Sequence, residues 1–278
     1  MRFLSDRAIP GVESFDGTTF RRAVRTSDGR PAVIGLTPRL DGDGVLLRVV
    51  AEGIEEPSPL VRLARRLFDL DTDPTEIDAT LSADPALGPL VRATPGIRLP
   101  GSTDGFELAV RAILGQQVSV RAARTFAGRI AEASGTPLER PVEGVTRLFP
   151  TAEQLAEGSL GSLGLTKARE NTLKRLAELV ATGDVDLSGA TDREATAERL
   201  LAVPGIGPWT VAYVSMRALR NPDAFPVGDL GVRLGFEALG LPSAPGAMQE
   251  HAERWRPWRA YAVMHLWNGE RGRDGVRG

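Results

Sequence analysis

The side chains best suited to chemistry lie in the last third of the chain. The segment Val203-Pro204-Gly205-Ile206-Gly207-Pro208-Trp209-Thr210 contains a glycine-rich turn and an aromatic ring, and a carboxylate, Asp229, follows twenty residues after Trp209. All four tryptophans and both tyrosines of the chain fall between positions 209 and 267. A phosphate-binding turn, flat rings and a carboxylate are together the groups that chemistry on a nucleobase requires.

The glycine-rich turn is predicted to join two helices. Gly205 and Gly207 can adopt positive φ angles, which brings bare N–H groups to the surface at the start of the second helix. These groups and the helix dipole can bind a phosphate oxygen without any side chain. An ordinary tight turn between helices explains a bare Gly-x-Gly equally well, but the longer string in a helical context is more specific.

The aromatic rings are predicted to stack on a flat ligand. Trp209 and Tyr213 lie four residues apart on the second helix and therefore share a face, and Trp267 ends another aromatic segment. Such rings suit an extruded base, with added cation–π attraction if that base is positively charged. For the three rings within 255–261 we favour a place in the core instead.

Asp229 has two possible roles. It follows Gly228 and precedes an apolar helical pattern, so it is a natural helix N-cap. An ionised carboxylate that faces the anomeric carbon of a nucleotide can also stabilise an oxocarbenium-like sugar as the base departs, or orient the attacking water. The two roles are compatible, and the local sequence leaves both open.

The composition excludes several classes of protein. The chain has 278 residues, 42% of them hydrophobic, which is enough for a sizeable core in one large domain or two. It has no cysteine, which excludes disulfides, thiolate catalysis and cysteine-bound zinc or iron–sulfur centres. No apolar run approaches the ~20 residues of a membrane span, and the first residues are too few and too polar for a signal peptide. We therefore expect a cytoplasmic protein without membrane association.

The net charge of −2 argues mildly against a nucleic-acid partner, because nucleic-acid-binding domains often carry a basic excess. Arginines nevertheless outnumber acidic residues in the segments 107–130 and 251–278. Runs of charge are usually solvated faces, so these arginines alone do not indicate DNA binding.

The chemical groups need elements that position them, and the N-terminal third is predicted to be α+β. Short β-prone runs at 18–26, 32–36 and 45–50 are separated by turns, including Asp41-Gly42-Asp43-Gly44, which predicts an antiparallel sheet. A helix is predicted to begin with Ser58 as its N-cap.

A junction is predicted at Pro95–Gly101, where prolines and glycines suit neither helix nor strand. It divides the chain into an α+β domain, 1–98, and an all-α domain, 99–278, which contains a helix-hairpin-helix at 195–219. One helix is marked by Phe106 and Ile113, and a second is capped by Ser119 and stops at Gly135. Further helices are predicted at 152–157, 168–181, 192–202, 208–219, 230–239, 246–255 and 257–268.

Several segments carry a family resemblance. The hairpin and Asp229 resemble the helix-hairpin-helix/Gly-Pro-Asp superfamily of DNA glycosylases. The segments Arg111–Val120, Phe225-Pro226 and Glu253–Arg259, with His265-Leu266-Trp267, are similar to the bacterial 3-methyladenine DNA glycosylase II family. The resemblance extends from about residue 8 to residue 267. It implies an α+β N-terminal domain with an antiparallel sheet, like half of the TATA-binding protein, followed by an all-α glycosylase core.

The resemblance implies a monofunctional DNA glycosylase. Such an enzyme flips an alkylated purine such as 3-methyladenine out of double-stranded DNA and hydrolyses its N-glycosidic bond. In the lyase branch of the superfamily a nucleophilic lysine stands at the position of Trp209, and this chain has no lysine after Lys174. An abasic site with an uncut strand is the implied product. The implied catalytic residue is Asp229, with a base pocket formed by Trp209, Tyr213, Trp267 and Gln116.

Further roles follow from the same resemblance. Gln117 stands where the family inserts an apolar wedge into the minor groove, and Asn268 stands where the family can have tyrosine. No cofactor is required, although the hairpin can hold a structural monovalent cation, and the protein is expected to be a monomer. The implied phosphate-binding residues are Gly205, Ile206, Gly207 and Thr210, and the implied cation ligands are the main-chain carbonyls of Leu201, Val203 and Ile206.

Two other interpretations remain open at this point. One is a non-catalytic helix-hairpin-helix module that senses bent or damaged DNA and releases no base. The other is the same fold acting on deaminated purines. Asp229 and the aromatic rings argue against the non-catalytic module, because binding a phosphate group requires neither a carboxylate nor aromatic rings.

Overall fold

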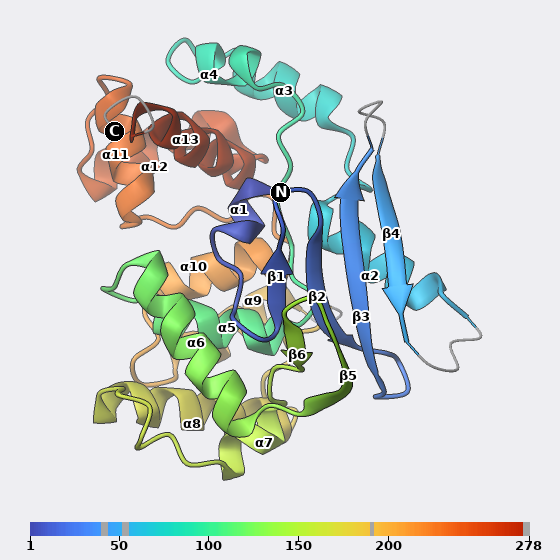
Figure 1. The fold of residues 1–278 in the computed structure, drawn as a ribbon. Coiled ribbons are helices and arrows are strands. Elements are labelled where there is room, and N and C mark those ends of the chain that lie inside the picture. Colours follow the sequence, from blue (N-terminus) through green and yellow to red (C-terminus); the bar gives the residue numbers. More distant parts are fainter. Residues whose placement is uncertain (40–43, 52–55, 190–191, 275–278) are drawn as a thin grey trace.

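A computed structural model of the chain describes residues 1–39, 44–51, 56–189 and 192–274. An antiparallel sheet fills the N-terminal part in the order β1-β2-β3-β4 (Figure 1). The predicted antiparallel sheet is confirmed, although β1 was not predicted. Of the predicted Asp41–Gly44 turn, positions 41–43 lie outside the described residues. The strands are β1 (Glu13–Phe15), β2 (Phe20–Arg25), β3 (Pro31–Pro38) and β4 (Val45–Val50).

Short helices flank this sheet. The helix α1 (Arg2–Ser5) precedes it, and α2 (Ser58–Phe68), α3 (Pro74–Ser82) and α4 (Gly88–Ala93) follow it. The start of α2 differs by one residue from the prediction, because Pro57 occupies the N-cap position and Ser58 already belongs to the helix. No side chain caps this end.

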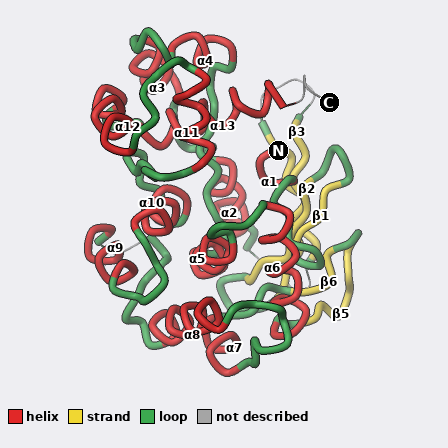
Figure 2. The backbone as a smooth tube through the Cα atoms, turned by 90° about the vertical axis from the view of Figure 1, so that its left-hand side faces the viewer, coloured by secondary structure: helices red, strands yellow, loops and turns green. Residues whose placement is uncertain are grey.

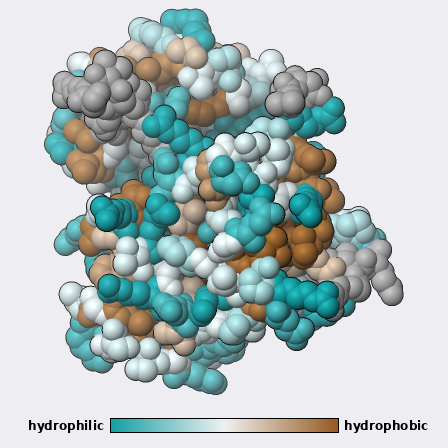
Figure 3. Space-filling model, in the orientation of Figure 1, coloured by the Kyte–Doolittle hydropathy of each residue, from teal (hydrophilic) through white to brown (hydrophobic). Residues whose placement is uncertain are grey.

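The two faces of the sheet have different surroundings. Residues Phe20, Val24, Ile34 and Leu36 of one face are buried in a core shared with α2. Figure 3 shows hydrophobic side chains gathered over the strands on the other face, where Leu46 of β4 is exposed.

From residue 105 onward the chain is mainly helical, as predicted. Ser119 and Gly135 bound α6 as expected, and the helices predicted from 152 onward are present with ends shifted by a few residues. Among the described residues, no helix has both the length and the apolarity of a membrane span. The elements are α5 (Gly105–Leu114), α6 (Val120–Ser134), α7 (Ala152–Glu157), α8 (Lys167–Ala181), α9 (Arg193–Leu201), α10 (Pro208–Arg217), α11 (Leu230–Ala238), α12 (Pro245–Ala252), the short 3₁₀ helix Glu253–Trp255 and α13 (Arg259–Asp274).

One hairpin departs from the helical pattern of this part. The strands β5 (Pro137–Val142) and β6 (Val145–Arg147) pair with each other. Leu138 and Val145 pack with Ala23 and Val33 on the outer face of the N-terminal sheet. Burial against a distant strand therefore stabilises this hairpin, although its own sequence has two prolines and little alternation.

Two hydrophobic cores connect the elements. One combines the N-terminal sheet and α2–α4 with α11–α13, and the other lies among α5–α10. In Figures 1 and 2 the helices α3 and α4 lie beside α11–α13, above the rest of the helical part. The N-terminal and C-terminal segments thus share one core, and the boundary at 98/99 stays a prediction.

Candidate active site

Asp229 lies at the first turn of α11 and receives three N–H donors. Its Oδ1 accepts from the Val232 amide at 3.0 Å, which is the predicted N-cap bond, and from Trp267 Nε1 at 2.8 Å. Its Oδ2 accepts from Trp209 Nε1 at 2.9 Å. An ionised carboxylate has about four acceptor sites. The three donors therefore leave Oδ2 with acceptor capacity for one more group.

The aromatic rings predicted to form the base pocket converge on this carboxylate. Trp209 and Tyr213 are stacked, with ring centroids 5.5 Å apart, as their spacing on α10 requires. Tyr213 and Trp267 are 6.3 Å apart at an interplanar angle of 43°. The structure thus brings together Asp229, Trp209, Tyr213 and Trp267 from α10, α11 and α13.

Gly231 allows the Trp267 ring to reach Asp229. A Cβ at position 231 would lie 2.7 Å from Trp267 Cδ1 and 2.9 Å from its Nε1. Only glycine leaves this space free on the first turn of α11. Gly231 could not be predicted as a site residue, because nothing in its local sequence pattern shows that a ring from α13 crosses it.

Phe3 is a second residue that the sequence analysis missed. Its ring stacks on Trp267 with centroids 5.9 Å apart and an interplanar angle of 12°. A cavity of about 740 Å³ borders Phe3 and Trp267 and extends to Asn268, but Asp229 is not among its lining residues. The N-terminal helix α1 therefore supplies a ring that stacks on Trp267.

Arginines surround the Tyr213 phenol. Burial would raise the pKa of Tyr213, but Arg217, Arg7 and Arg111 outweigh that effect and lower the pKa below its usual value. The Arg217 Nη1 donates to the phenol oxygen at 2.9 Å. The phenol of Tyr213 thus lies in a positive environment.

In the hairpin between α9 and α10, Gly205 has the positive φ angle expected of it, whereas Gly207 has φ −100° and does not. Gly205 has φ +89°, and a Cβ there would overlap the Thr172 hydroxyl, which itself donates to the Pro204 carbonyl at 2.8 Å. Gly207 is the N-cap of α10 and provides no side-chain cap. The first N–H groups of a helix have no partner within it. This turn therefore has the geometry of an anion site.

Gln116 and Thr210 have contacts other than those predicted. The Gln116 amide donates to the Gly205 carbonyl at 3.0 Å and to the Thr210 hydroxyl at 2.8 Å. Thr210 is 2% exposed, so its hydroxyl is not available at the surface for a phosphate. These contacts do not support a base-pocket role for Gln116 or a phosphate contact by the Thr210 side chain. Both side chains instead hold the turn after α5 against the hairpin.

Gln117 is exposed between α5 and α6, at φ +57°. A left-handed conformation is costly for a residue other than glycine, and such strain is found at functional sites.

Asn268, predicted to stand where the family can have tyrosine, forms a hydrogen bond within the chain. Its amide donates to the Thr94 hydroxyl at 3.3 Å.

The carbonyls predicted as cation ligands lie at the end of α9 and in the hairpin. The Val203 oxygen already accepts the Ile206 N–H at 3.0 Å. A carbonyl oxygen has two lone pairs, so this bond does not prevent a contact with a cation. No group of three or more His, Asp or Glu side chains suited to a metal ion occurs within the described ranges.

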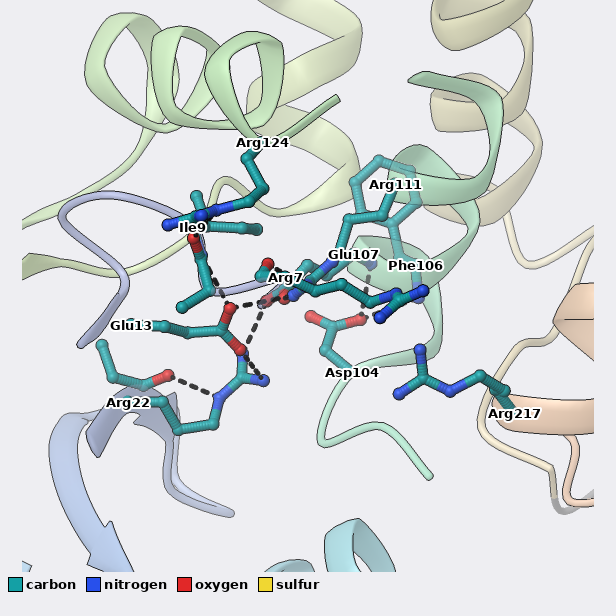
Figure 4. Close-up of polar contacts among 12 residues, drawn as sticks. Arg7, Ile9, Glu13, Arg22, Asp104, Phe106, Glu107, Arg111, Arg124 and Arg217 are labelled. Atoms are coloured by element: carbon teal, nitrogen blue, oxygen red, sulfur yellow. Dashed lines mark hydrogen bonds and ion pairs between the residues drawn. The ribbon is translucent and has the colours of Figure 1, made fainter. Parts of the chain in front are cut away.

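Three of the four arginines of 107–130 have structural contacts, and Arg121 is exposed. Figure 4 shows Arg111 within a cluster that includes Glu13, Glu107 and Arg22. Arg124 donates to the Ala8 carbonyl at 2.9 Å and Arg129 donates to the Leu163 carbonyl at 3.0 Å. The expected solvated face is therefore wrong for Arg111, which is bound to buried carboxylates.

The core location favoured for the aromatic segment is confirmed. Trp255 is fully buried, Tyr261 is 3% exposed, and the half-buried Trp258 packs against the same core. Arg256 and Arg259 form ion pairs with Asp223 and Glu253. This segment therefore belongs to the core that also contains Trp267.

Comparison with known families gives two adjacent matches. Residues 1–104 match the AlkA N-terminal domain, and residues 110–260 match the HhH-GPD superfamily base excision DNA repair protein.

Individual relatives cover most of the chain. The chain is 42% identical over 264 residues to the probable bifunctional transcriptional activator/DNA repair enzyme AlkA of Mycobacterium tuberculosis, covering 95% of this chain and 53% of the relative. The chain thus spans about half the length of that relative. It is 33% identical to DNA-3-methyladenine glycosylase 2 of Escherichia coli, covering 96% of this chain and 92% of the relative.

Solved structures are similar as well. The 3-methyladenine DNA-glycosylase from Archaeoglobus fulgidus has a TM-score of 0.80 at 25% identity, covering 96% of this chain and 91% of that one. The Schizosaccharomyces pombe 3-methyladenine DNA glycosylase in complex with abasic DNA has a TM-score of 0.60 at 26% identity, covering 69% of this chain and 95% of that one. The chain therefore belongs to the HhH-GPD superfamily of base excision DNA repair proteins, in the branch that carries an AlkA N-terminal domain.

Proposed function

We propose that the protein is a monofunctional DNA glycosylase that hydrolyses the N-glycosidic bond of alkylated purines, 3-methyladenine first, in duplex DNA. The observation that carries this proposal is the convergence of two indole N–H groups on the Asp229 carboxylate beside the Tyr213 ring. The names of the E. coli and A. fulgidus relatives support the same substrate class.

In this mechanism Asp229 is the catalytic carboxylate. Departure of the base leaves positive charge on the sugar, and a fixed carboxylate stabilises that charge as it develops. Oδ2 has the free acceptor site, so it is the oxygen that faces the anomeric carbon or the attacking water. Trp209 and Trp267 hold the carboxylate in place through their N–H groups.

The rings provide the binding surface for the base. Tyr213 and Trp267, backed by Phe3, supply the stacking faces. A purine alkylated on a ring nitrogen is cationic, so it binds well to aromatic faces and departs without prior protonation. A site without a general acid is therefore sufficient for such bases.

The hairpin and the turn after α5 are proposed to hold the DNA. The backbone N–H groups around Gly205 and Gly207 bind a phosphate, which explains how a chain of net charge −2 can bind DNA. The Ile206 N–H, predicted for the same role, already donates to the Val203 carbonyl at 3.0 Å. Gln117 enters the minor groove as the wedge, although an amide fills the gap less tightly than a branched alkyl group. The abasic-DNA complex of the S. pombe relative supports DNA as the partner.

Strand cleavage is not expected. The Trp209 indole occupies the position of the lyase nucleophile and is bound to Asp229. Lys174, one of the two lysines of the chain, donates to the carbonyls of Leu155, Ala156 and Gly158, and the other, Lys167, pairs with Glu170. Neither contacts Asp229, so neither is in place to form a Schiff base there.

Three further properties are part of the proposal. The enzyme needs no cofactor. A structural monovalent cation at the hairpin would use the carbonyls of Leu201, Val203 and Ile206, which offer the oxygen ligands that hard cations prefer. The protein is proposed to act as a cytoplasmic monomer.

Release of bases from methylated duplex DNA tests the function. We expect 3-methyladenine in the supernatant and strands that break only after alkaline treatment of the abasic sites. Binding of abasic DNA without base release would instead favour the damage-sensing module. Faster release of hypoxanthine than of 3-methyladenine from matched duplexes would favour deaminated purines as the substrate.

A further inference from the structure

Arg217, at the end of α10, is a buried arginine whose guanidinium contacts three separate parts of the chain. Its Nε donates to the Pro100 carbonyl at 2.8 Å and its Nη2 to the Gly101 carbonyl at 2.9 Å. Its Nη1 donates to the Tyr213 phenol oxygen at 2.9 Å. The residue is 3% exposed.

All of these acceptors are neutral. Within the described part of the chain, no carboxylate forms an ion pair with Arg217. Burying a charge without a counter-ion destabilises a fold, and apolar side chains of similar volume would avoid that cost. A buried guanidinium in this setting therefore suggests a function beyond packing.

The same guanidinium also faces the rings of the proposed base site. Its Cζ lies 4.8 Å from the centroid of the Phe3 ring and 5.6 Å from that of Tyr213. The Arg7 Cζ lies 4.0 Å from the Phe3 centroid. Figure 4 shows Arg217 directed toward Arg7. Phe3 is thus in contact with two guanidinium groups and with Trp267.

We propose that Arg217 is a positioning residue of the base site. It fixes the Tyr213 phenol and the Phe3 ring relative to Trp267, and its bonds to Pro100 and Gly101 join this arrangement to the segment that precedes α5. The inference rests on the proposed function. Because Trp267 is bonded to Asp229, a shift of Tyr213 or Phe3 changes how the base lies above the carboxylate.

The planar guanidinium is essential to this role. Three donors in one plane reach three acceptors from different segments, whereas a lysine ammonium is a point charge on a flexible stem. The variant R217K is therefore expected to retain the charge and lose the fixed geometry.

A double-mutant cycle between Arg217 and Tyr213 tests the proposal. The rate of base release is measured in single turnover on a duplex with one N-methylated purine, for wild type, R217M, Y213F and the double variant. We expect R217M to lower the rate about tenfold or more, as misplacement of a reacting group does. The double variant should be no slower than the slower single variant, because both changes remove the same contact.

Stability is followed in parallel by thermal unfolding, and R129M is the matched control. Arg129 also donates to a carbonyl, and its Cζ lies 5.8 Å from the centroid of the Phe126 ring. It lies on α6, away from Asp229 at the start of α11 (Figure 1). R129M should release the base at the wild-type rate. If R217M does not fold, R217K takes its place in the cycle.

The outcomes separate the two proposals. Rate losses that multiply in the double variant, or a wild-type rate in R217M, would overturn the positioning role while leaving the glycosylase function intact. A wild-type protein that releases no base from methylated DNA would instead refute the proposed function itself.

Discussion

Asp229 uses one carboxylate to cap α11 and to hold two indole rings. The sequence predicted the cap, because an acidic residue before an apolar helical pattern favours one, and it predicted the shared face of Trp209 and Tyr213 from their i, i+4 spacing. It did not predict that the indole N–H groups of Trp209 and Trp267 donate to Asp229. It did not predict Phe3 or Gly231, whose importance depends on the path of α13 across α1 and α11. Contacts between distant segments have no local pattern.

At the same scale, Gly231→Ala should impair catalysis without unfolding the protein. The new methyl group would occupy the space of the Trp267 indole and displace it from Asp229. Single-turnover base release should fall about tenfold or more. Gly246→Ala is the matched control, since Gly246 is also the second residue of its helix and has open space around it. It should leave the rate unchanged and raise stability by up to about 1 kcal/mol. Equal rates in the two variants would refute the packing argument.

His265 predicts a pH dependence of stability. It is 1% exposed, both ring nitrogens lack a hydrogen-bond partner in the described structure, and burial lowers its pKa to about 4, with Asp78 acting weakly in the opposite direction. The unfolded state, with a pKa near 6.5, binds the proton more readily. Neutral, buried His265 therefore makes its full contribution to the free energy of unfolding above about pH 6.5. This contribution is lost as the pH falls toward 4, by about 3 kcal/mol in total.

Urea unfolding of wild type and His265→Leu between pH 7.5 and 4.5 measures this effect. The variant should lose less stability than wild type over that range. Parallel losses in the two proteins would show that His265 is not the titrating group.

At the scale of elements, most helices were predictable because their apolar residues recur at helical spacing and some begin at a capping residue, as α6 does at Ser119 and α11 at Asp229. The strands β5 and β6 were not, because Leu138 and Val145 form a strand only when they pack against Ala23 and Val33. The hairpin α9–α10 was predictable from its glycines. The contact that requires Gly205, the Thr172 side chain of α8, was not.

Gly205→Ala should weaken DNA binding. The residue has φ +89°, which strains any side chain, and its Cβ would overlap Thr172. Such strain is of order 1–3 kcal/mol, and it displaces the N–H groups proposed to bind the phosphate, so the affinity for DNA should fall. Titration of abasic duplex with the variant and with wild type measures the change in affinity.

Gly183→Ala is the control, because Gly183 has φ +79° with nothing near its Cβ position. It should lose some stability and keep the wild-type affinity. A wild-type affinity in Gly205→Ala would argue against phosphate binding by this turn.

At the scale of the whole molecule, a buried ionic cluster joins the N-terminal sheet to α5. Arg22 pairs with Glu13 at 3.0 Å and with Glu107 at 2.7 Å, and Arg111 pairs with both carboxylates at 3.0 Å. Arg111 also donates to the Arg7 carbonyl, close to Phe3 in the chain. The cluster thus holds in place the N-terminal segment that carries Phe3, whose ring stacks on Trp267. The sequence did not reveal it, because its members come from three separate segments.

Glu13→Gln should destabilise the whole protein. It would leave two buried arginines with one carboxylate, and breaking a buried ion pair costs about 3–5 kcal/mol. Glu178→Gln, in the exposed pair with Arg175, should cost less than ~1 kcal/mol. Chemical denaturation of the two variants gives the comparison, and equal losses would contradict the role assigned to the cluster.

The most direct measurement is single-turnover base release by Asp229→Asn on a duplex with one 3-methyladenine. The amide retains the size of the side chain and can still cap α11, but it lacks the negative charge that stabilises the sugar cation. We predict that the rate falls by about 10²-fold or more while binding of abasic duplex is retained. Release at the wild-type rate would contradict Asp229 as the catalytic carboxylate.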